Sequence, residues 1–548
     1  MLTILTGGMY AQKTVGLLTY DDTAFQPGYN LMFPHNQSSV YLLDNCGRVV
    51  NSWEQPSDRR PGNSVELMEN GDIIFASRPA DFSADRIWAG GGGMYVARHT
   101  WDNIPVWEYA LNDSMNRLHH DIVVMPNGNV LAIAWEVIEI AGMLQAGRDT
   151  AAIPTTELWP DWILELEPDG NGGANIVWEW HAWDHLIQDF DANGDNFGVV
   201  ADHPERIDVN YYDSSPAIED WHHSNAIDYN PTLDQIALSV PAFNEIWIID
   251  HSTTTAEAAG TTGGNSGRGG DLLYRWGNPA AYQMGDSTTQ QLFFQHDVQW
   301  IDDHLDSTVA DFGKIGVFNN RVGSDFSTVN IINQPWDAST SSYTMSSGVF
   351  LPTGFDWTYS TTPPQDMWST GLSGLQRLPN GNTLILIGRF GRAIEITPNE
   401  NIVWEYKQPL VQGNAASQGD TLNVNQNLTF RMDRYMPDYP AFANRTLVSG
   451  DYLEVNPDTT ICTLPVVAAD DVVERAVTMY PNPTTGWLSL QRETGRPATV
   501  EVYDVVGHRV RQAEISGLNP KIDLRGLQRG IYFVRLDQTS VGKVMVSE

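Results

Sequence analysis

Short aromatic and β-branched segments recur along most of the chain, and polar turns separate them. The clearest of these segments are V-W-E-Y at 106–109, V-W-E-W at 177–180, L-Y-R-W at 273–276 and V-W-E-Y at 403–406. Residues of these types favour strands, and the intervening dipeptides Asn127-Gly128 and Asn380-Gly381 are typical of tight hairpins. Long helical periodicity is absent from the sequence. The pattern therefore predicts an all-β protein.

A second repeated unit combines a strand, a turn and another strand, and it places an equivalent residue in each copy. It reads H-D-I-V-V-M-P-N-G-N-V-L from His120 and S-G-L-Q-R-L-P-N-G-N-T-L from Ser373, with weaker copies from Asn63, His223 and His296. Units of this kind are typical of a β-propeller built from four-stranded blades. Because several repeats carry long insertions, the length predicts six blades.

The equivalent position holds histidine in three copies, at His120, His223 and His296. Equivalent positions converge on the axis of a closed ring of repeats, so we expect the three imidazoles to meet in one pocket. Such a pocket can transfer a group through a nucleophilic nitrogen. It can also hold a divalent metal for hydrolysis or elimination, or bind a ligand without catalysis. No carboxylate recurs beside the histidines in metal-ligand spacing, so we expect no cofactor here.

Composition narrows the class of partner. The 548 residues include 31 basic and 68 acidic side chains, which gives a net charge of −37. This excess of negative charge argues against nucleic acid and against anionic membrane surfaces as partners. It does not argue against an anionic substrate, because a small pocket sets its own local potential. No apolar run approaches the roughly 20 residues of a membrane span.

The two ends of the chain differ from the repeats. Residues 1–11 contain a short apolar stretch that ends in Ala11, which predicts the end of a truncated signal peptide. Residues 12–463 hold the repeats, and residues 464–475 are small, apolar and acidic, as expected of a linker. Residues 476–548 contain alternating segments that predict a small C-terminal β-sandwich.

Two cysteines, Cys46 and Cys462, occur near the two ends of the expected ring. A disulfide between them would join these ends, and an oxidising export route would permit it. Two unpaired buried thiols are the alternative, because the geometry of the pair cannot be deduced from the sequence.

One segment resembles the first half of a calcium loop. It reads D-F-D-A-N-G-D and offers oxygen ligands at Asp189, Asp191, Asn193 and Asp195. The twelfth position of the loop is Val200 rather than glutamate. A turn stabilised by its own side chains therefore competes with a structural Ca²⁺ at this place.

The tail resembles the type IX secretion C-terminal sorting domain of Bacteroidetes-type bacteria. The similarity rests on Y-P-N-P-T-T-G, V-Y-D-V-V-G, G-I-Y-F-V-R-L and the closing G-K-V-M-V, in that order. It implies that the type IX secretion machinery is a partner of the chain. The protein would then be released from the cell or held on the outer-membrane surface.

The repeats resemble the arylsulfotransferase family. The similarity rests on D-W-H-H-S-N-A-I-D-Y from Asp220, H-H-D from His119, R-W-G-N from Arg275, Q-H-D from Gln295 and S-G-L-Q-R from Ser373. In that family a six-bladed propeller moves a sulfuryl group from a phenolic sulfate ester to a phenolic acceptor without a nucleotide donor. A histidine is transiently sulfated, and other axial histidines and an arginine assist.

The resemblance implies roles for particular residues. His296 matches the family's nucleophile through its Q-H motif, and His120 matches the axial histidine of an earlier blade. His223 matches the histidine of the W-x-H-x-N motif and would bind or protonate an oxygen of the sulfate ester. His119 and Asn225 belong to the same motifs and are weaker candidates for substrate binding, His119 because its side chain should point to the opposite strand face.

One position departs from the family pattern. The arginine that follows the D-x-I-x-x-S segment in the family aligns with Pro241 here. A substitute cation would have to come from elsewhere, and we consider Arg377, Arg389 and Arg321. Ser373, at the equivalent position of the last repeat, is a further candidate for substrate binding.

Overall fold

The computed structural model describes residues 13–212, 219–302, 305, 307–443, 445–462, 478–492, 497–504, 509–536 and 539–547. The chain divides into two compact units, residues 1–464 and 465–548. With 42% strand and 6% helix, the all-β prediction is confirmed. The expected signal peptide at 1–11 and the expected linker at 464–475 lie outside the described residues.

Within the described residues, the first unit contains six antiparallel sheets of four or five strands. The first three sheets are β35 (Thr429–Tyr435), β2 (Tyr29–Pro34), β3 (Ser39–Asp44) and β4 (Val49–Glu54); β5 (Arg59–Leu67), β6 (Ile73–Pro79), β7 (Tyr95–His99) and β8 (Pro105–Ala110); and β9 (Asn116–Val124), β10 (Val130–Glu136), β13 (Asp161–Pro168) and β14 (Ala174–His181). The other three are β17 (Ala226–Asn230), β18 (Gln235–Val240), β19 (Glu245–Asp250) and β20 (Tyr274–Trp276); β21 (His296–Trp300), β22 (Ile315–Asn319), β23 (Thr328–Ile332) and β28 (Trp357–Tyr359); and β29 (Gly374–Arg377), β30 (Thr383–Ile387), β31 (Arg392–Ile396), β32 (Ile402–Lys407) and β1 (Gly16–Tyr20). The aromatic segments of the sequence form β8, β14, β20 and β32, each the fourth strand of its sheet.

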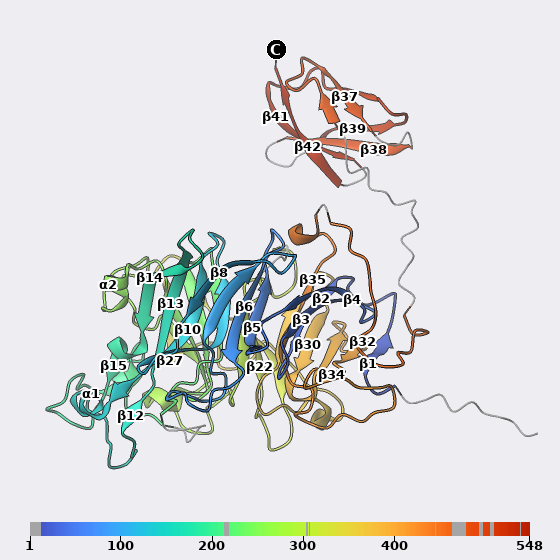
Figure 1. Cartoon of the computed structure of the whole chain (residues 1–548). Helices are drawn as coiled ribbons and strands as arrows, with labels where there is room; N and C mark the ends of the chain where they lie inside the picture. The colour runs from blue at the N-terminus through green and yellow to red at the C-terminus, as the bar shows by residue number, and fades with distance from the viewer. Residues whose placement is uncertain are drawn as a thin grey trace, which may run out of the picture. The chain divides into compact units, whose positions relative to one another are not determined.

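The first strand of each sheet packs against the first strand of the next. β5 lies against β9, β9 against β17, β17 against β21, β21 against β29, β29 against β35, and β35 against β5. Neighbouring sheets such as β5–β8 and β9–β14 run side by side (Figure 1). Carboxylates add bonds at these junctions, because Asp121 accepts from the Ile227 N–H at 3.1 Å and Asp297 accepts from the Leu375 N–H at 2.8 Å. The order of sheets returns to its start, which is the arrangement of a β-propeller.

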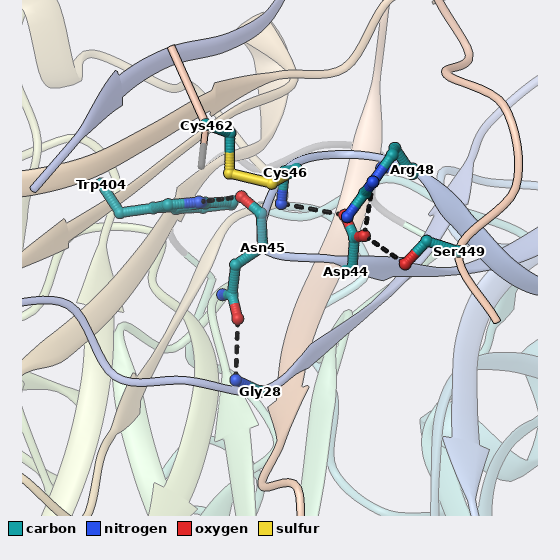
Figure 2. The surroundings of a disulfide bond; sticks show 8 residues. All are labelled: Gly28, Asp44, Asn45, Cys46, Arg48, Trp404, Ser449 and Cys462. Carbon is teal, nitrogen blue, oxygen red and sulfur yellow. Dashed lines mark hydrogen bonds and ion pairs between the residues drawn. A yellow bond between two sulfur atoms is a disulfide. The ribbon is translucent and has the colours of Figure 1, made fainter. Parts of the chain in front are cut away.

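The two ends of the repeat region meet. β35 pairs with β2, and β1 pairs with β32. Cys46 and Cys462, 416 residues apart in the sequence, form a disulfide beside these pairings (Figure 2). Next to it, Asp44 accepts hydrogen bonds from the Cys46 N–H at 2.9 Å and from the Ser449 hydroxyl at 2.6 Å. Of the two alternatives for the cysteines, the structure has the disulfide.

A buried ion pair network joins strands that carry two of the predicted site histidines. Arg431 of β35 places Nη2 2.6 Å from Asp121 Oδ2 and Nε 2.7 Å from Asp297 Oδ1. Asp121 directly follows His120, and Asp297 directly follows His296. The network therefore holds β9 and β21 in position across the inner part of the unit.

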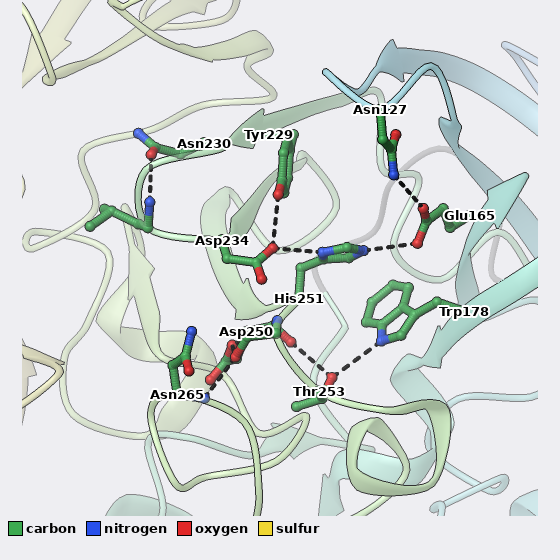
Figure 3. A network of polar contacts seen from close by, with 12 residues as sticks. Asn127, Glu165, Trp178, Tyr229, Asn230, Asp234, Asp250, His251, Thr253 and Asn265 are labelled. Carbon is green, nitrogen blue, oxygen red and sulfur yellow. Dashed lines mark hydrogen bonds and ion pairs between the residues drawn. The ribbon is translucent and has the colours of Figure 1, made fainter. Parts of the chain in front are cut away.

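A second polar network lies between the sheets of β13 and β19. His251 places Nδ1 2.8 Å from Asp234 Oδ1 and Nε2 3.2 Å from Glu165 Oε2 (Figure 3). Burial disfavours the charged imidazole, but the two carboxylates outweigh burial and raise the pKa of His251 to about 9. A protonated histidine thus connects two neighbouring sheets.

We expect His251→Gln to destabilise the protein more at about pH 6 than at about pH 10. The pKa of histidine in an unfolded chain is about 6.5. The stabilisation from charged His251 is therefore fully present below that pH and is lost as the pH rises through about 9. The expected loss at the lower pH is on the order of 3 kcal/mol. Urea unfolding at both pH values measures it, with His203→Gln on the surface as the control; an equal loss at both would contradict the assignment.

The described strands of the second unit form two sheets. They are β36 (Thr478–Tyr480), β37 (Trp487–Gln491) and β40 (Lys521–Asp523), and β39 (Arg509–Ile515), β38 (Ala498–Tyr503), β41 (Gly530–Leu536) and β42 (Thr539–Val546). Leu488 and Ile522 from the first sheet share one core with Val500 and Val534 from the second. Two sheets around a common core are the arrangement of a β-sandwich.

The remaining elements are short. They are α1 (Ile140–Gln145), α2 (Thr255–Ala258), β11 (Ile138–Glu139), β12 (Glu157–Leu158), β15 (Leu186–Ile187), β16 (Ile207–Asp208), β24 (Trp336–Asp337), β25 (Ser342–Tyr343), β26 (Met345–Ser346), β27 (Val349–Phe350), β33 (Leu410–Val411), β34 (Asn414–Ala415) and a few turns of 3₁₀ helix. In the part of the chain that the structure describes, no helix has the length and apolar character needed to cross a membrane.

Candidate active site

A cavity of about 240 Å³ lies where first strands of several sheets meet. An enclosed space of roughly 150 Å³ already holds a benzene molecule, so this cavity has room for an aryl ring. Its lining residues are His35, Asn63, Arg78, Trp88, Ala89, Gly90, Gly91, Gly92, His120, His223, Phe294, His296, Gly371, Leu372, Arg389 and Phe430. None of the described residues that line it is acidic. The cavity is therefore basic, although the whole chain carries a net charge of −37.

His296, at the start of β21, presents a neutral imidazole to the cavity. Its Nδ1 lies 2.8 Å from Asn320 Oδ1, and the Asn320 amide nitrogen donates to the carbonyls of Ser369 and Leu372 at 2.9 Å. Because the amide orientation is fixed, Nδ1 carries the proton and Nε2 keeps its lone pair. Burial and the nearby His223 lower the pKa of His296 to about 3 despite the hydrogen bond to Asn320. Nε2 is thus available as a nucleophile.

His223 has an anionic partner. It follows the turn that begins at Asp220, and its Nδ1 lies 2.5 Å from Asp220 Oδ2, which is fully buried. A carboxylate in this position fixes the proton on Nδ1 and stabilises the charged imidazolium. Nε2 is left for a ligand in the cavity. This arrangement suits proton donation and acceptance.

His120 is supported from behind by a second histidine. His119 Nε2 lies 3.2 Å from Asp161 Oδ1, and His119 Nδ1 lies 2.9 Å from His120 Nδ1. The carboxylate favours the proton on His119 Nε2, so His119 Nδ1 accepts from His120 Nδ1 and leaves His120 Nε2 with a lone pair. Burial and the neighbouring His223 lower the pKa of His120 well below its ordinary value. His119 therefore positions His120 and does not itself line the cavity.

The three predicted histidines come together at this one place. The rings of His120 and His223 are 4.6 Å apart, and Phe294 packs between His223 and His296 at 5.7 and 6.0 Å. His120 and His223 both adopt left-handed backbone conformations, with φ of 52° and 54°. Such conformations cost roughly 1–2 kcal/mol per residue and are typical of functional sites.

A run of glycines forms the wall beside His120. Gly91 has φ of +80°, and a Cβ built on it would lie 2.1 Å from His120 Nε2. The Gly91 carbonyl accepts a hydrogen bond from Asn63 Nδ2 at 2.6 Å, which holds this wall against β5. Glycine is required here because any side chain would displace the imidazole.

Of the three arginine candidates, Arg389 lines the cavity. A Cβ built on Gly371 would lie 3.3 Å from Arg389 Nη2 and 3.8 Å from His296 Nε2, so both groups face the space in front of that glycine. Arg321 lies one layer behind, with its guanidinium 3.6 Å over the Phe294 ring. An anion in front of Gly371 would therefore contact Arg389 and the nucleophilic nitrogen together.

Three weaker candidates are not brought to the cavity. Arg377 is held by an ion pair with Asp311 at 2.6 Å. Asn225 donates to the Gln295 carbonyl at 2.8 Å. The Ser373 hydroxyl donates to the Ser369 hydroxyl at 2.9 Å. These contacts are between neighbouring strands and loops, and none of the three residues lines the cavity.

The loop at 189–195 folds around a glutamine. The Gln188 amide nitrogen donates to the carbonyls of Asp191 and Asp195 at 2.8 and 3.0 Å, and Asp191 Oδ1 accepts from the Asn193 N–H at 2.9 Å. Asp189 Oδ2 accepts from Gln283 at 3.1 Å. Among the described residues, no group of three or more His, Cys, Asp or Glu is arranged to hold a metal ion. Hydrogen bonds between side chains and the backbone thus stabilise this turn.

Several cavity residues were not anticipated from the sequence. They are His35, Arg78, Trp88, Phe294 and Phe430. The four successive glycines at 90–93 were an available signal, because glycine lets the backbone approach a side chain or ligand closely. Nothing in the sequence around the other residues distinguishes them from packing residues.

The fold and this cavity define a β-propeller with a basic, histidine-lined pocket. The family model for arylsulfotransferase (ASST) matches residues 11–348, which is more than half of the chain. The protein therefore belongs to the arylsulfotransferase family, and this membership supports sulfotransferase activity. A second model, for the secretion system C-terminal sorting domain, matches residues 478–546. The sorting domain implies export through the type IX secretion system, to the cell surface or the medium.

The solved structures that match this chain are distant from it in sequence. A protein of unknown function from Bacteroides caccae is 11% identical, with 74% of this chain and 98% of that one covered and a TM-score of 0.41. Virginiamycin B lyase from Staphylococcus aureus is 11% identical, with 73% and 86% covered and a TM-score of 0.31. A protein from Lactobacillus plantarum is 7% identical, with 90% and 98% covered and a TM-score of 0.36. No curated protein matches the sequence.

Proposed function

We propose that the protein is an aryl-sulfate sulfotransferase that moves a sulfuryl group from a phenolic sulfate ester to a phenolic acceptor through a sulfated His296. The observation that carries the proposal is the shared space in front of Gly371, which the neutral His296 Nε2 and the Arg389 guanidinium both face. A sulfate ester is an anion, and the cavity offers it cations without a competing carboxylate among its described lining residues.

In the first half-reaction, His296 Nε2 attacks the sulfur and the S–O bond to the phenol breaks. The leaving oxygen takes the proton from Nε2 of the His223 imidazolium, and a free phenol departs. In the sulfated His296 ring, the Nδ1–H continues to donate its hydrogen bond to Asn320 Oδ1. Arg389 stabilises the negative charge on the sulfuryl oxygens, as fixed donors do in phosphoryl transfer.

In the second half-reaction, the acceptor phenol enters the same cavity. Neutral His223 takes its proton, the phenol oxygen attacks the sulfur, and the S–N bond breaks, which returns the lone pair to His296. Asp220 stabilises the positive charge that His223 gains in this step. His120, whose ring lies 4.6 Å from that of His223, packs beside this base and limits where the acceptor hydroxyl can lie.

The proposal includes a propeller of six blades. The six sheets of four or five strands within the described residues, and the contacts that return from β35 to β5, support this number. In that arrangement His120, His223 and His296 belong to three consecutive blades and approach the axis from one side.

Release of nitrophenol from nitrophenyl sulfate tests the function, with and without phenol and with and without a chelator. We expect release that increases with phenol and is insensitive to chelation, with formation of phenyl sulfate in equal amount. Release that needs no acceptor and stops with chelator would instead indicate a metal-dependent hydrolase. Binding of the ester without turnover would indicate a propeller that binds but does not catalyse.

We expect Gly91→Ala to reduce this turnover by about 100-fold, because a methyl group at that place displaces the His120 ring and misplacement by about 1 Å has an effect of this size. Gly170→Ala is the matched control. Gly170 also has a positive φ, of +73°, but a Cβ there meets nothing within 4 Å. Because alanine is strained at a positive φ, both variants should be destabilised to a similar extent in thermal unfolding. An equal effect of the two on turnover would refute the steric explanation.

A further inference from the structure

The cavity has two chemically different sides. His120, His223 and His296 come from the three consecutive sheets that begin with β9, β17 and β21. The other three sheets contribute His35, which follows β2, Arg78 of β6, and Arg389 between β30 and β31. One side thus carries the imidazoles of the proposed transfer reaction, and the other side carries two guanidinium groups and a fourth imidazole.

His35 lines the cavity together with the two arginines. Burial, and then the charges of Arg78 and Arg389, lower the pKa of His35 to about 3, so its ring is neutral. Its Nε2 is buried and, within the residues the structure describes, has no hydrogen-bond partner. A buried nitrogen without a partner costs free energy unless a ligand completes it.

The two arginines have neutral partners. Arg78 Nη2 donates to Asn36 Oδ1 at 2.9 Å, and Arg389 Nη1 donates to Asn425 Oδ1 at 3.2 Å. In the described part of the chain neither forms an ion pair with a carboxylate, and burial lowers the pKa of both. Three arginines that are buried elsewhere in the unit, Arg117, Arg275 and Arg434, are each paired with a carboxylate. Two unpaired charges beside one cavity therefore favour anionic ligands at two places.

A pair of stacked aromatic rings lies next to Arg78. Trp88 is stacked on Phe82 with ring centroids 3.5 Å apart, and Arg117 covers Trp88 at 4.6 Å. Arg78 lies 5.8 Å from the Phe82 ring. Phe82 and Arg117 thus both pack against Trp88, which lines the cavity.

We propose that His35 and Arg78 form a second anion subsite, and that the substrates are aryl sulfates with a carboxylate on the ring. This deepens the proposed function and rests on it for the transfer step. Arg389 holds the sulfuryl group beside His296, while Arg78 and the His35 Nε2–H bind the carboxylate at the other end of the molecule. The aryl ring then spans the cavity between Phe294 and Phe430.

Binding of two sulfonates to the full chain tests the subsite without any transfer. Sulfonates have a C–S bond that cannot be transferred, and 4-sulfobenzoate differs from benzenesulfonate by one carboxylate. Calorimetry is expected to show 4-sulfobenzoate bound about tenfold more tightly or better, the size of one charge-assisted hydrogen bond. Arg78→Gln and His35→Ala should each remove that difference and change the affinity for benzenesulfonate less than about twofold.

Arg86→Gln is the matched control, because Arg86 lies in the loop that follows β6 but its Nη2 is paired with Glu157 at 2.5 Å, outside the cavity. Equal affinity of the wild-type protein for both sulfonates would overturn the subsite, and so would an equal loss for both in Arg78→Gln. Discrimination between the sulfonates with no turnover of any aryl sulfate would preserve the subsite and refute the transfer. Turnover of nitrophenyl sulfate without discrimination between the sulfonates would preserve the transfer and refute the subsite.

Discussion

Replacing His296 with alanine is expected to abolish phenol-dependent release of nitrophenol, with a loss of about 10³-fold or more. The reason is that Nε2 of this residue forms the covalent bond to sulfur and lies with Arg389 in the space in front of Gly371. Stopped assays at a fixed donor concentration measure the loss. His203→Ala, at an exposed 3₁₀ turn, should keep full activity.

The covalent intermediate gives an independent readout of the same prediction. The wild-type protein, incubated with excess donor in the absence of acceptor and quenched in alkali, should carry one SO₃ group on the peptide that contains His296. The alanine variant should carry none. A sulfated peptide centred on His120 or His223 instead would move the nucleophile to that residue and contradict our assignment.

Asp220→Asn is expected to lower turnover by about 10²- to 10⁴-fold, by analogy with loss of the anionic partner of a catalytic histidine. An amide in place of the carboxylate removes the negative charge 2.5 Å from His223 Nδ1, so the imidazolium that donates the proton is no longer stabilised. The loss should be larger for phenyl sulfate than for nitrophenyl sulfate, because nitrophenolate leaves with little need of a proton. Parallel assays with both donors measure this.

Asp202→Asn, on the surface, is the control for removal of a negative charge. If the Asp220 variant lost the same factor with both donors, His223 would act in binding and not as the proton donor. If the Asp220 variant kept full activity with both donors, neither His223 nor Asp220 would take part in the mechanism.

Much of the fold was predictable because its determinants are local. The V-W-E-Y segments and the Asn-Gly turns specify strands and hairpins by themselves, and the repeat gives their register. The meeting of His120, His223 and His296 was predictable for the same reason, since equivalent positions of a repeat share a place in the ring. The repeat thus allowed a local sequence pattern to predict a contact between residues far apart in the chain.

The rest of the site depends on contacts that have no local signature. Arg377 and Arg389 belong to the same repeat, yet Arg377 pairs with Asp311, whereas Arg389 sits on a 3₁₀ turn and reaches the cavity. His35 and Arg78 come from the opposite side of the ring, in segments without a repeated motif. Asp161 acts on His120 only through His119, a two-step contact that residue spacing does not reveal.

The bridge between Cys46 and Cys462 has a mechanical consequence for a protein held at a surface by its tail. Any tension in the tether enters the first unit just after Cys462 and passes through the sulfur atoms directly to Cys46. The strand pairing of β35 with β2, which consists of hydrogen bonds that could peel apart one after another, lies outside this load path. Tension on the C-terminal tail would therefore not separate β35 from β2.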